Sequence, residues 1–522
     1  MAIFSLKLLK MKLQILTKIC FLLFAVVGLS LTASAQGTTT GALKGAITDA
    51  SNAALIGATV TAVHQPTGTF YGTATDLNGN FQINNVKVGG PYKVEISYTG
   101  YQTVVYEGIT VRLGEAAKIS AQLSEGAIEI DAVIVTARQG TTGENSGTST
   151  QISAEDIDLL PTLDRNLNDF TRLTPQSKGT FGGGFSVAGA NNRFNAIYID
   201  GAVNNDVFGL AGSGTNGGQT GIAPISIDAI DQIQVVVSPY DVTLGGFAGG
   251  GINAVTKSGT NEFKGTAYYF LQNEDFAGET NTTLTDRTGS DRTELNPFSS
   301  TLYGASLGGP IVKDKVFFFV NAEIENQETP SPFDFGTYRG SSSQEDLNNL
   351  RTFIRDTHGY DPGEFGDIVD RLDGVRLFGK LDFNLNNTNK LTVRHQYTRG
   401  EQLNLNVSDN DEINFSNNGV FFPTTTNSTA VELNSQFGSK FSNNLIVGFT
   451  AVRDDRDPIG QDFPYVTIED GDDGRIEFGS EQFSTANILD QDVLTITNNF
   501  KMYSGNHTFT FGTHNELSLI HI

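Results

Sequence analysis

The chain has 522 residues, a formal net charge of −24, and 58 glycines, 36 phenylalanines and 15 tyrosines. Its length predicts two to four domains, and its acidity argues against nucleic-acid binding, which needs a basic surface. Cys20, its one cysteine, lies in a predicted leader, so the mature chain has no disulfide, thiolate metal site or cysteine nucleophile. The many glycines and aromatic residues favour numerous strands joined by tight turns.

Residues 1–35 are predicted to be a signal peptide. Lysines up to Lys18 precede an apolar run from Ile19 to Leu31, and small residues before Gln36 suit cleavage. Removing this leader brings the net charge to −28, because it carries four lysines. No later stretch approaches the roughly 20 apolar residues of a spanning helix. Any membrane-spanning part is therefore expected to be a closed β-barrel, which satisfies every backbone group in lipid.

Residues 41–123 are predicted to form a small β-sandwich, because short alternating strands recur between turn signals. Strands are expected at 43–48, 59–63, 68–74, 81–83, 92–97 and 118–123. Residues 76–80 are predicted to be a hairpin turn and not a calcium loop, because no glutamate follows at the EF-hand spacing. The segments 57–60, 75–81 and 94–101 resemble the carboxypeptidase-regulatory-like (transthyretin-like) domain. Related sandwiches bind sugars, so carbohydrate contact is an alternative role.

Residues 131–150 are interpreted as a partner-binding strand followed by a linker rich in Gly, Thr and Ser. A strand without neighbours in sequence has an unpaired edge, which suits strand addition by a partner. The run resembles the TonB box, which pairs with a periplasmic energiser protein. The box residues are Asp131, Ala132, Val133, Ile134, Val135, Thr136 and Ala137. The alternative is that this run is the first strand of the next domain.

Residues 151–258 are predicted to form a small α+β domain. Ser153 and Asp156 predict a capped helix that ends before Pro161, and 163–173 is a second candidate helix. A strand then stops at a tight turn formed by Asp200 and Gly201. An apolar run over 233–237, expected to be buried on both faces, precedes a glycine-rich turn and a strand over 252–256.

This ordered pattern resembles the plug of a TonB-dependent outer-membrane transporter. The resemblance implies functional plug residues, which are Arg193, Asn195, Asp200, Gly201, Gly249, Gly250 and Gly251. Arg193 is the candidate for a basic residue that faces the barrel wall. Its alternative is an ordinary surface arginine.

Residues 262–522 are predicted to be part of an outer-membrane β-barrel. Over 375–385, apolar residues alternate with polar ones, as expected for one face in lipid and one in a wet lumen. Strands are also expected at 263–275, 298–309, 316–326, 391–397, 428–440, 443–453, 491–503 and 506–517. Short turns, one of them at 442–444, alternate with long acidic loops at 276–297, 327–373, 401–427 and 454–490. Nine strands are an odd number and fewer than the 22 of the family, so we expect a C-terminally truncated chain.

No catalytic, metal or cofactor site is predicted. Gly304, Ser306 and Gly308 match the hydrolase pattern G-x-S-x-G, but that motif needs a strand-to-helix turn and these residues fall in a predicted strand. The glycine-rich segment lacks the G-K-[ST] ending of a phosphate-binding loop. The six histidines show no metal-ligand spacing.

The sequence therefore predicts an all-β dominated chain with an N-terminal β-sandwich, a small α+β plug and an incomplete antiparallel transmembrane β-barrel. Segments 238–247 and 303–311 resemble the Oar-like subgroup of the Bacteroidetes type. This resemblance implies energy-coupled import across the outer membrane, with the sandwich and TonB box in the periplasm and the long loops outside. The implied partners are a TonB-type energiser, outer-membrane lipid and an unknown cargo such as an oligosaccharide, a peptide or a chelate. The alternatives are a surface adhesin or carbohydrate-binding protein, a passive porin and, more remotely, a hydrolase that uses Ser306.

Overall fold

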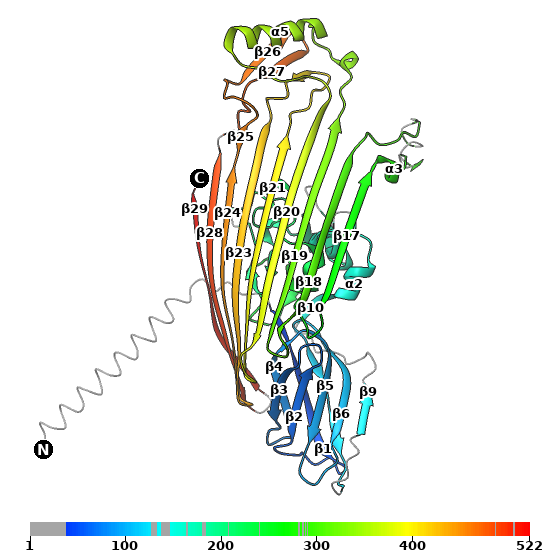
Figure 1. The fold of residues 1–522 in the computed structure, drawn as a ribbon, viewed down its shortest axis with the longest axis vertical. Helices are drawn as coiled ribbons and strands as arrows, with labels where there is room; N and C mark the ends of the chain where they lie inside the picture. Colours follow the sequence, from blue (N-terminus) through cyan, green and yellow to red (C-terminus); the bar gives the residue numbers. More distant parts are fainter. Residues whose placement is uncertain are drawn as a thin grey trace, which may run out of the picture.

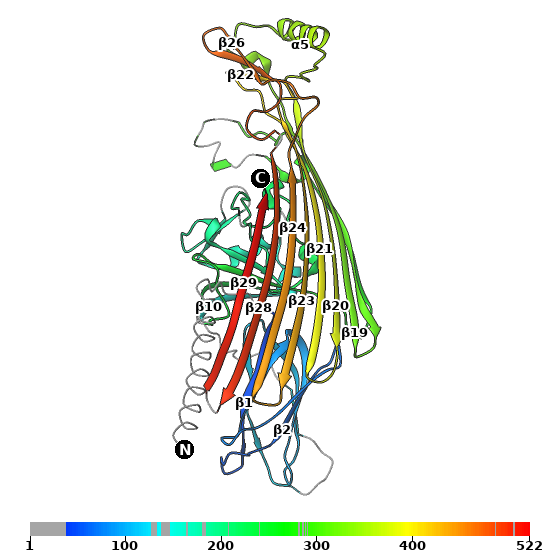
Figure 2. The same ribbon diagram turned by 90° about the vertical axis from the view of Figure 1, so that its left-hand side faces the viewer.

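The computed structural model shows a tall curved sheet with a sandwich at one end, a folded lobe at the other and a small domain against one face (Figures 1 and 2). It describes residues 38–126, 133–136, 147–162, 165–179, 184–206, 208–239, 241–279, 282–283, 287, 289, 291–485, 487–504 and 507–521. The predicted signal peptide and the predicted box residues Asp131, Ala132 and Ala137 lie outside this range.

The N-terminal domain is the predicted β-sandwich. In its described part, one sheet contains β1 (Thr40–Asp49), β4 (Asn80–Lys87), β7 (Ala116–Lys118) and β8 (Ala121–Leu123). The other sheet has the order β3 (Thr69–Ala74), β2 (Thr59–His64), β5 (Gly89–Ser97), β6 (Val104–Val111) and β9 (Val133–Thr136). Alternate side chains of both sheets point inward, so residues such as Leu43, Val60 and Ile96 form a dry core.

Two features of the sandwich differ from the prediction. Residues 76–80 connect β3 to β4, which lie in different sheets, so the predicted hairpin is wrong. The Asp76 carboxylate accepts the backbone N–H groups of Asn78 and Asn80 at 2.9 Å, which holds the turn without a cation. Strand β6 was not predicted, because Glu107 and Gly108 interrupt its apolar pattern.

The central domain is built on a sheet with the order β10 (Gly147–Ser153), β15 (Ile230–Pro239), β16 (Gly251–Thr256), β13 (Ala196–Ile199) and β14 (Ala202–Val203). Strand β16 is buried along its whole length and β15 along most of it, as the apolar runs predict. Smaller elements cover the sheet. They are α2 (Ala154–Leu159), η1 (Leu167–Leu173), β11 (Ser177–Gly179), β12 (Phe185–Val187), η2 (Asn192–Phe194), η3 (Gly218–Thr220) and η4 (Ile227–Ala229).

The predicted first helix of this domain is confirmed. Ser153 caps α2 in a capping box with Asp156, and the helix ends before Pro161. The second candidate helix is a short 3-10 segment, η1, which is capped by Asn166.

The curved sheet, here called the wall, contains the nine predicted long strands in the described part of the chain. They are β17 (Lys264–Asn273), β18 (Ser299–Val312), β19 (Val316–Ser331), β20 (Ile368–Asn384), β21 (Asn389–Asn404), β23 (Val420–Phe437), β24 (Phe441–Asp455), β28 (Ile488–Ser504) and β29 (His507–His521). Each pairs antiparallel with the next, and a short strand, β25 (Asp457–Pro458), adds to β23. In the described part of the chain, β17 and β29 form the two edges of the wall and do not pair with each other, so the wall is an open part of a barrel.

The predicted alternation of the wall is confirmed in β20. Arg376 and Lys380 are 4% and 6% exposed, whereas Leu377 and Leu381, on the other face, are 45% and 37% exposed. The polar face therefore points to the central domain, and the apolar face points outward. The predicted turn at 442–444 is wrong. It lies at 438–440, where Gly438 adopts a φ of +61° that favours glycine.

The outer ends of three wall hairpins fold together into one outer lobe (Figure 1). It contains α5 (Gln344–His358), η5 (Phe335–Thr337), and a sheet in the order β22 (Glu412–Asn414), β27 (Gly474–Phe478) and β26 (Val466–Asp470). Leu347, Ile413 and Ile476 share its core. The prediction of long acidic loops is correct in position, but it missed this lobe. A separate short helix, α3 (Glu274–Ala277), follows β17.

No helix in the described ranges combines the length and apolarity needed to cross a membrane.

Candidate functional site

The Asp200 carboxylate lies at the centre of the contact between the central domain and the wall. Asp200 and Gly201 both have positive φ angles, +45° and +71°, and form the predicted tight turn between β13 and β14. Asp200 is buried, and it accepts hydrogen bonds from the backbone N–H of Thr256 at 2.9 Å and from its hydroxyl at 2.6 Å. The turn is thereby fixed to the end of β16.

Two cations of the wall meet this carboxylate. Lys380 Nζ lies 3.4 Å from Asp200 Oδ1 and donates to the Thr256 carbonyl at 3.1 Å. Arg394 Nε lies 3.5 Å from Asp200 Oδ2, and its Nη2 donates to the Ile199 carbonyl at 2.8 Å. Lys380 and Arg394 are direct partners across β20 and β21. All three charged side chains are buried, and removing one partner of a buried ion pair typically costs about 3–5 kcal/mol.

A second contact joins the central domain to the wall at Ser226. Its hydroxyl donates to Glu323 Oε2 at 2.8 Å, and Tyr268 donates to the same oxygen at 2.5 Å. Arg376 balances the charge through a 2.7 Å bond to Glu323 Oε1. Nearby, the Pro224 carbonyl accepts a 2.7 Å bond from the Thr398 hydroxyl.

A third contact lies farther along the wall. Gln219 donates to Asp454 Oδ2 at 3.0 Å and accepts from Arg456 at 2.7 Å. Apolar packing between the two bodies includes Phe319 and Phe378 of the wall, which join the central domain's core. The central domain is therefore held by polar and ionic contacts with several wall strands, together with this apolar packing.

The glycine run predicted to allow close backbone approach does so around Asn195. The Asn195 side chain donates to the Phe185 carbonyl at 2.6 Å and accepts from the Gly250 N–H at 2.9 Å. A Cβ atom on Gly249 would lie 2.4 Å from Asn195 Oδ1, and one on Gly250 would lie 2.7 Å from Val187. A Cβ on Gly251 would meet the Phe247 ring at 2.9 Å. Larger residues would therefore displace β12 or the Asn195 amide.

Arg193 lies in η2 and is exposed, close to Gly209. Its predicted role at the wall remains a prediction. The cations that meet the central domain here are Lys380 and Arg394, which the sequence reasoning missed as site residues. The alternation predicted over 375–385 puts Lys380 on the polar face of its strand, and this was the available signal.

The predicted TonB box is described over Val133–Thr136, which forms β9. This strand pairs parallel with β6, with Val104 opposite Val133 and Glu107 opposite Thr136. It is therefore an added strand of the sandwich and not the first strand of the central domain. Its role as a box remains a prediction.

Ser306 does not occupy a hydrolase elbow. It lies within β18, with strand on both sides, and its hydroxyl is 2.6 Å from that of Thr266. Among the residues that the structure describes, no group of three or more His, Cys, Asp or Glu side chains is arranged to hold a metal ion.

Three family models match the chain in the order of its domains. A carboxypeptidase regulatory-like domain matches residues 42–124, and an outer membrane beta barrel domain matches residues 255–338. Between them, residues 141–252 match the TonB-dependent receptor plug domain. In this order, the three matched domains are those of a TonB-dependent receptor with an N-terminal carboxypeptidase regulatory-like domain. The central domain of this receptor is thus its plug, its location is the outer membrane, and its family consists of transporters and receptors rather than enzymes.

Three individual proteins show what the chain is similar to. The receptor is 26% identical over 261 residues to the TonB-dependent transporter Oar of Myxococcus xanthus. The matched region covers 47% of this chain and 23% of Oar. The outer membrane transporter YddB from Escherichia coli superposes with a TM-score of 0.48 at 17% identity, over 71% of this chain and 48% of YddB. The siderophore receptor PirA from Acinetobacter baumannii gives 0.47 at 15% identity, over 71% and 47%. The chain thus spans less than a quarter of Oar and about half of these solved structures.

Proposed function

We propose that this receptor imports a cargo across the outer membrane with energy supplied by a TonB-type periplasmic energiser. The observation that carries this proposal is the way the plug is held against the wall. Asp200 contacts Lys380 and Arg394, and Ser226 and Gln219 form hydrogen bonds to wall side chains, while the apolar packing includes Phe319 and Phe378. Polar contacts can be exchanged for water when a passage opens, whereas a continuous apolar interface would hold the plug permanently.

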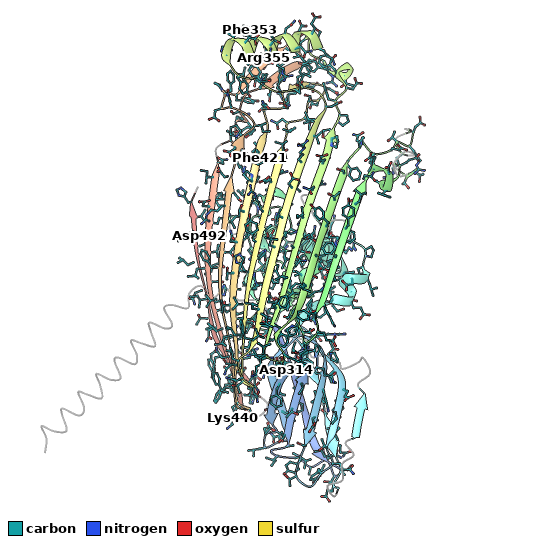
Figure 3. All side chains as sticks on the ribbon, viewed as in Figure 1. Asp314, Phe353, Arg355, Phe421, Lys440 and Asp492 are labelled. Carbon is teal, nitrogen blue, oxygen red and sulfur yellow. The ribbon has the colours of Figure 1, made fainter. Side chains whose placement is uncertain are left out.

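The two ends of the wall support an orientation. Short turns, such as the one that contains Asp314, lie beside the sandwich, and the outer lobe lies at the other end, where Phe353 and Arg355 project from α5 (Figure 3). Outer-membrane barrels place short turns in the periplasm and long loops outside. In our proposal the sandwich and the box therefore face the energiser, and the lobe meets the cargo.

We also propose a division of the chain into domains. It places a signal peptide at 1–35, the sandwich at 41–123, the box and linker at 131–150, the plug at 151–258 and the partial barrel at 262–522. The three matched family ranges support this order. In this scheme Asp131 to Ala137 bind the energiser by strand addition.

The cargo class stays open among oligosaccharides, peptides and chelates. The outer lobe exposes carboxylates such as Glu469, Asp472 and Asp473. Such a surface repels strongly anionic ligands, so we favour a neutral or cationic cargo. The siderophore named for PirA is a property of that protein.

Uptake in four strains tests the proposal. The full-length receptor, a receptor deletion, an energiser deletion and a receptor that lacks residues 131–137 are grown on a panel of candidate nutrients. We expect one nutrient to support growth in the first strain alone, with cargo binding to whole cells retained in the box deletion. A deletion of seven residues from the following linker, 140–146, is the control. An adhesin, favoured by the separately folded lobe, would keep its phenotype without the box.

A further inference from the structure

The sandwich contacts the plug through Leu113, just beyond the end of β6. The Leu113 N–H donates to Gln232 Oε1 at 3.1 Å, and its carbonyl accepts from Gln151 Nε2 at 2.8 Å. The Leu113 side chain is fully buried together with Val88 of the sandwich and Val255 of the plug. One residue of the sandwich is thus bound to two strands of the plug sheet and packed against a third.

The sandwich also contacts the ends of wall strands that adjoin the short turns. Thr69 and Asn384 exchange hydrogen bonds at 3.0 and 3.2 Å, and Asn85 donates to the Asn443 carbonyl at 3.1 Å. The Pro66 carbonyl accepts the N–H of Asn261, in the segment that joins plug to wall, at 2.8 Å. The sandwich therefore bridges plug and wall at the periplasmic end.

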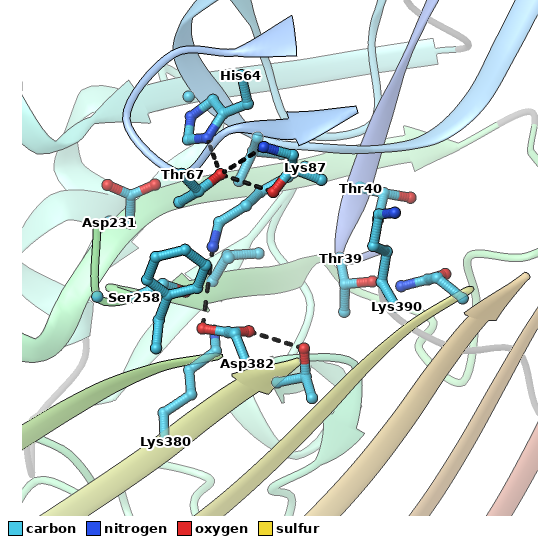
Figure 4. Close-up of a pocket in the computed structure, with 18 of the residues that line it drawn as sticks. Thr39, Thr40, His64, Thr67, Lys87, Asp231, Ser258, Lys380, Asp382 and Lys390 are labelled. Carbon is cyan, nitrogen blue, oxygen red and sulfur yellow. Dashed lines mark hydrogen bonds and ion pairs between the residues drawn. The ribbon is translucent and has the colours of Figure 1, made fainter. Parts of the chain in front are cut away.

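Charged groups of all three bodies meet in a cavity of about 240 Å³ at this junction (Figure 4). Lys87 of the sandwich lies 3.8 Å from Asp382 of the wall, and Asp231 of the plug and Lys380 line the same cavity. Burial raises the pKa of Asp231 and lowers the pKa of Lys87, and attraction between opposite charges opposes both shifts. The buried Lys87 is stabilised by the carboxylates of plug and wall, and its charge stabilises them in turn. These interactions exist only while the sandwich is in contact with plug and wall.

The predicted box is attached to the same strand that reaches the plug. Strand β9 pairs with β6 over Val104–Glu107, and β6 continues to Val111, two residues before Leu113. Ten residues separate Thr136 from Gly147, where the plug's β10 begins. Tension on the box therefore acts directly on β9 and on the strand β6 with which it pairs, and it reaches β10 only through those ten residues.

We propose that the sandwich is a mechanical latch, seated between plug and wall, which the energiser must release through β9 before the plug can move. This inference rests on the proposed import function and adds an ordered step to it. The latch is released when Leu113, Thr69 and Lys87 leave their partners. The plug contacts at Asp200 and Ser226 then bear the load.

A disulfide between sandwich and wall tests the latch. Thr69→Cys/Asn384→Cys places two thiols where side chains now touch, and residues 36–522 contain no natural cysteine. The control, Leu433→Cys/Leu445→Cys, joins facing residues of β23 and β24 and leaves the sandwich free. Both variants are made in the full-length receptor, and disulfide formation is confirmed by gel shift.

We expect the oxidised latch variant to lose at least about tenfold in energiser-dependent uptake, to retain pull-down by the energiser's periplasmic domain, and to recover on addition of dithiothreitol. The oxidised control should import at the wild-type rate. Wild-type uptake through the fully oxidised latch variant would overturn the latch alone. Uptake that is independent of the energiser in the reduced receptor would overturn the proposed function, and the latch with it.

Discussion

The carboxylate of Asp200 in the plug lies 3.4 Å from the ammonium group of Lys380 in the wall, and both side chains are buried. Arg394 lies on the other carboxylate oxygen, so two wall cations share one plug carboxylate. A substitution at Asp200 should therefore weaken the contact between plug and wall.

We expect Asp200→Asn to lower the free energy of local opening of the plug by about 3–5 kcal/mol, because the buried Lys380 and Arg394 would lose the carboxylate that both contact. Hydrogen exchange of β13 and β16 in the full-length receptor measures this. The double variant Asp200→Asn/Lys380→Met removes one uncompensated charge and should recover part of the loss. Unchanged exchange in Asp200→Asn would mean that the ion pairs do not hold the plug.

Gly250→Ala should destabilise the plug by about 1–3 kcal/mol, since the added Cβ would lie 2.7 Å from Val187 and force β12 away. Urea unfolding, followed by exchange of β12, is the appropriate assay. Gly179→Ala, also in the plug, is a matched control because its Cβ would meet nothing within 4 Å. Equal behaviour of the two variants would contradict the packing described for the glycine run.

Asp470→Ala should loosen the outer lobe. The Asp470 carboxylate accepts from the Tyr338 hydroxyl at 2.8 Å and from the Ser342 hydroxyl at 2.9 Å. Its removal takes this acceptor from Ser342 and leaves Tyr338 with the longer 3.3 Å bond to the Arg475 carbonyl. A loss of about 1–3 kcal/mol is expected. Limited proteolysis of intact cells should then cut the lobe faster while the barrel resists. Glu469→Ala, at an exposed neighbouring position, should leave the cleavage rate unchanged.

His64 should make the sandwich sensitive to acid. Burial, and to a lesser extent the charge of Lys87, lowers the pKa of His64 from 6.5 to about 3. Below pH 6.5 the unfolded chain therefore binds a proton that the folded sandwich refuses, so stability falls as pH falls towards 3. The loss should reach about 2 kcal/mol between pH 6.5 and pH 5.

Urea unfolding of β2 in the full-length receptor, monitored by hydrogen exchange corrected for intrinsic rates, measures this effect. His64→Gln should flatten the pH dependence over this range. A wild-type profile as flat as that of His64→Gln would show that His64 does not account for acid sensitivity.

Local sequence patterns predicted the elements whose partners are adjacent in the chain. The alternation around Arg376 and Lys380 identified a wall strand, and Asp200 with Gly201 identified a turn, because each depends on neighbouring residues. The nine wall strands follow the same rule, since each pairs with the next long strand.

Contacts between distant segments were not predictable in this way. The lobe's core draws Leu347, Ile413 and Ile476 from three separate connections, and no local pattern indicates that these connections pack together. The Ser343 and Asp346 capping box of α5 was a local signal that the sequence analysis missed. Lys87 and Asp382 belong to different domains, and nothing in their local sequence indicates that they meet. The pairing of β9 with β6 was missed because β6 itself was missed.

A disulfide between plug and wall tests whether the plug must move for import. Ala202→Cys/Gly448→Cys joins one residue of the plug to one of the wall, because a Cβ on Gly448 would lie 3.4 Å from the Cβ of Ala202. Initial uptake rates are compared in oxidised and reduced full-length receptor with the energiser present. We expect the initial uptake rate to be at least about tenfold lower in the oxidised form and to recover on addition of reductant, while cargo binding persists. Equal uptake with the disulfide fully formed would contradict a moving plug.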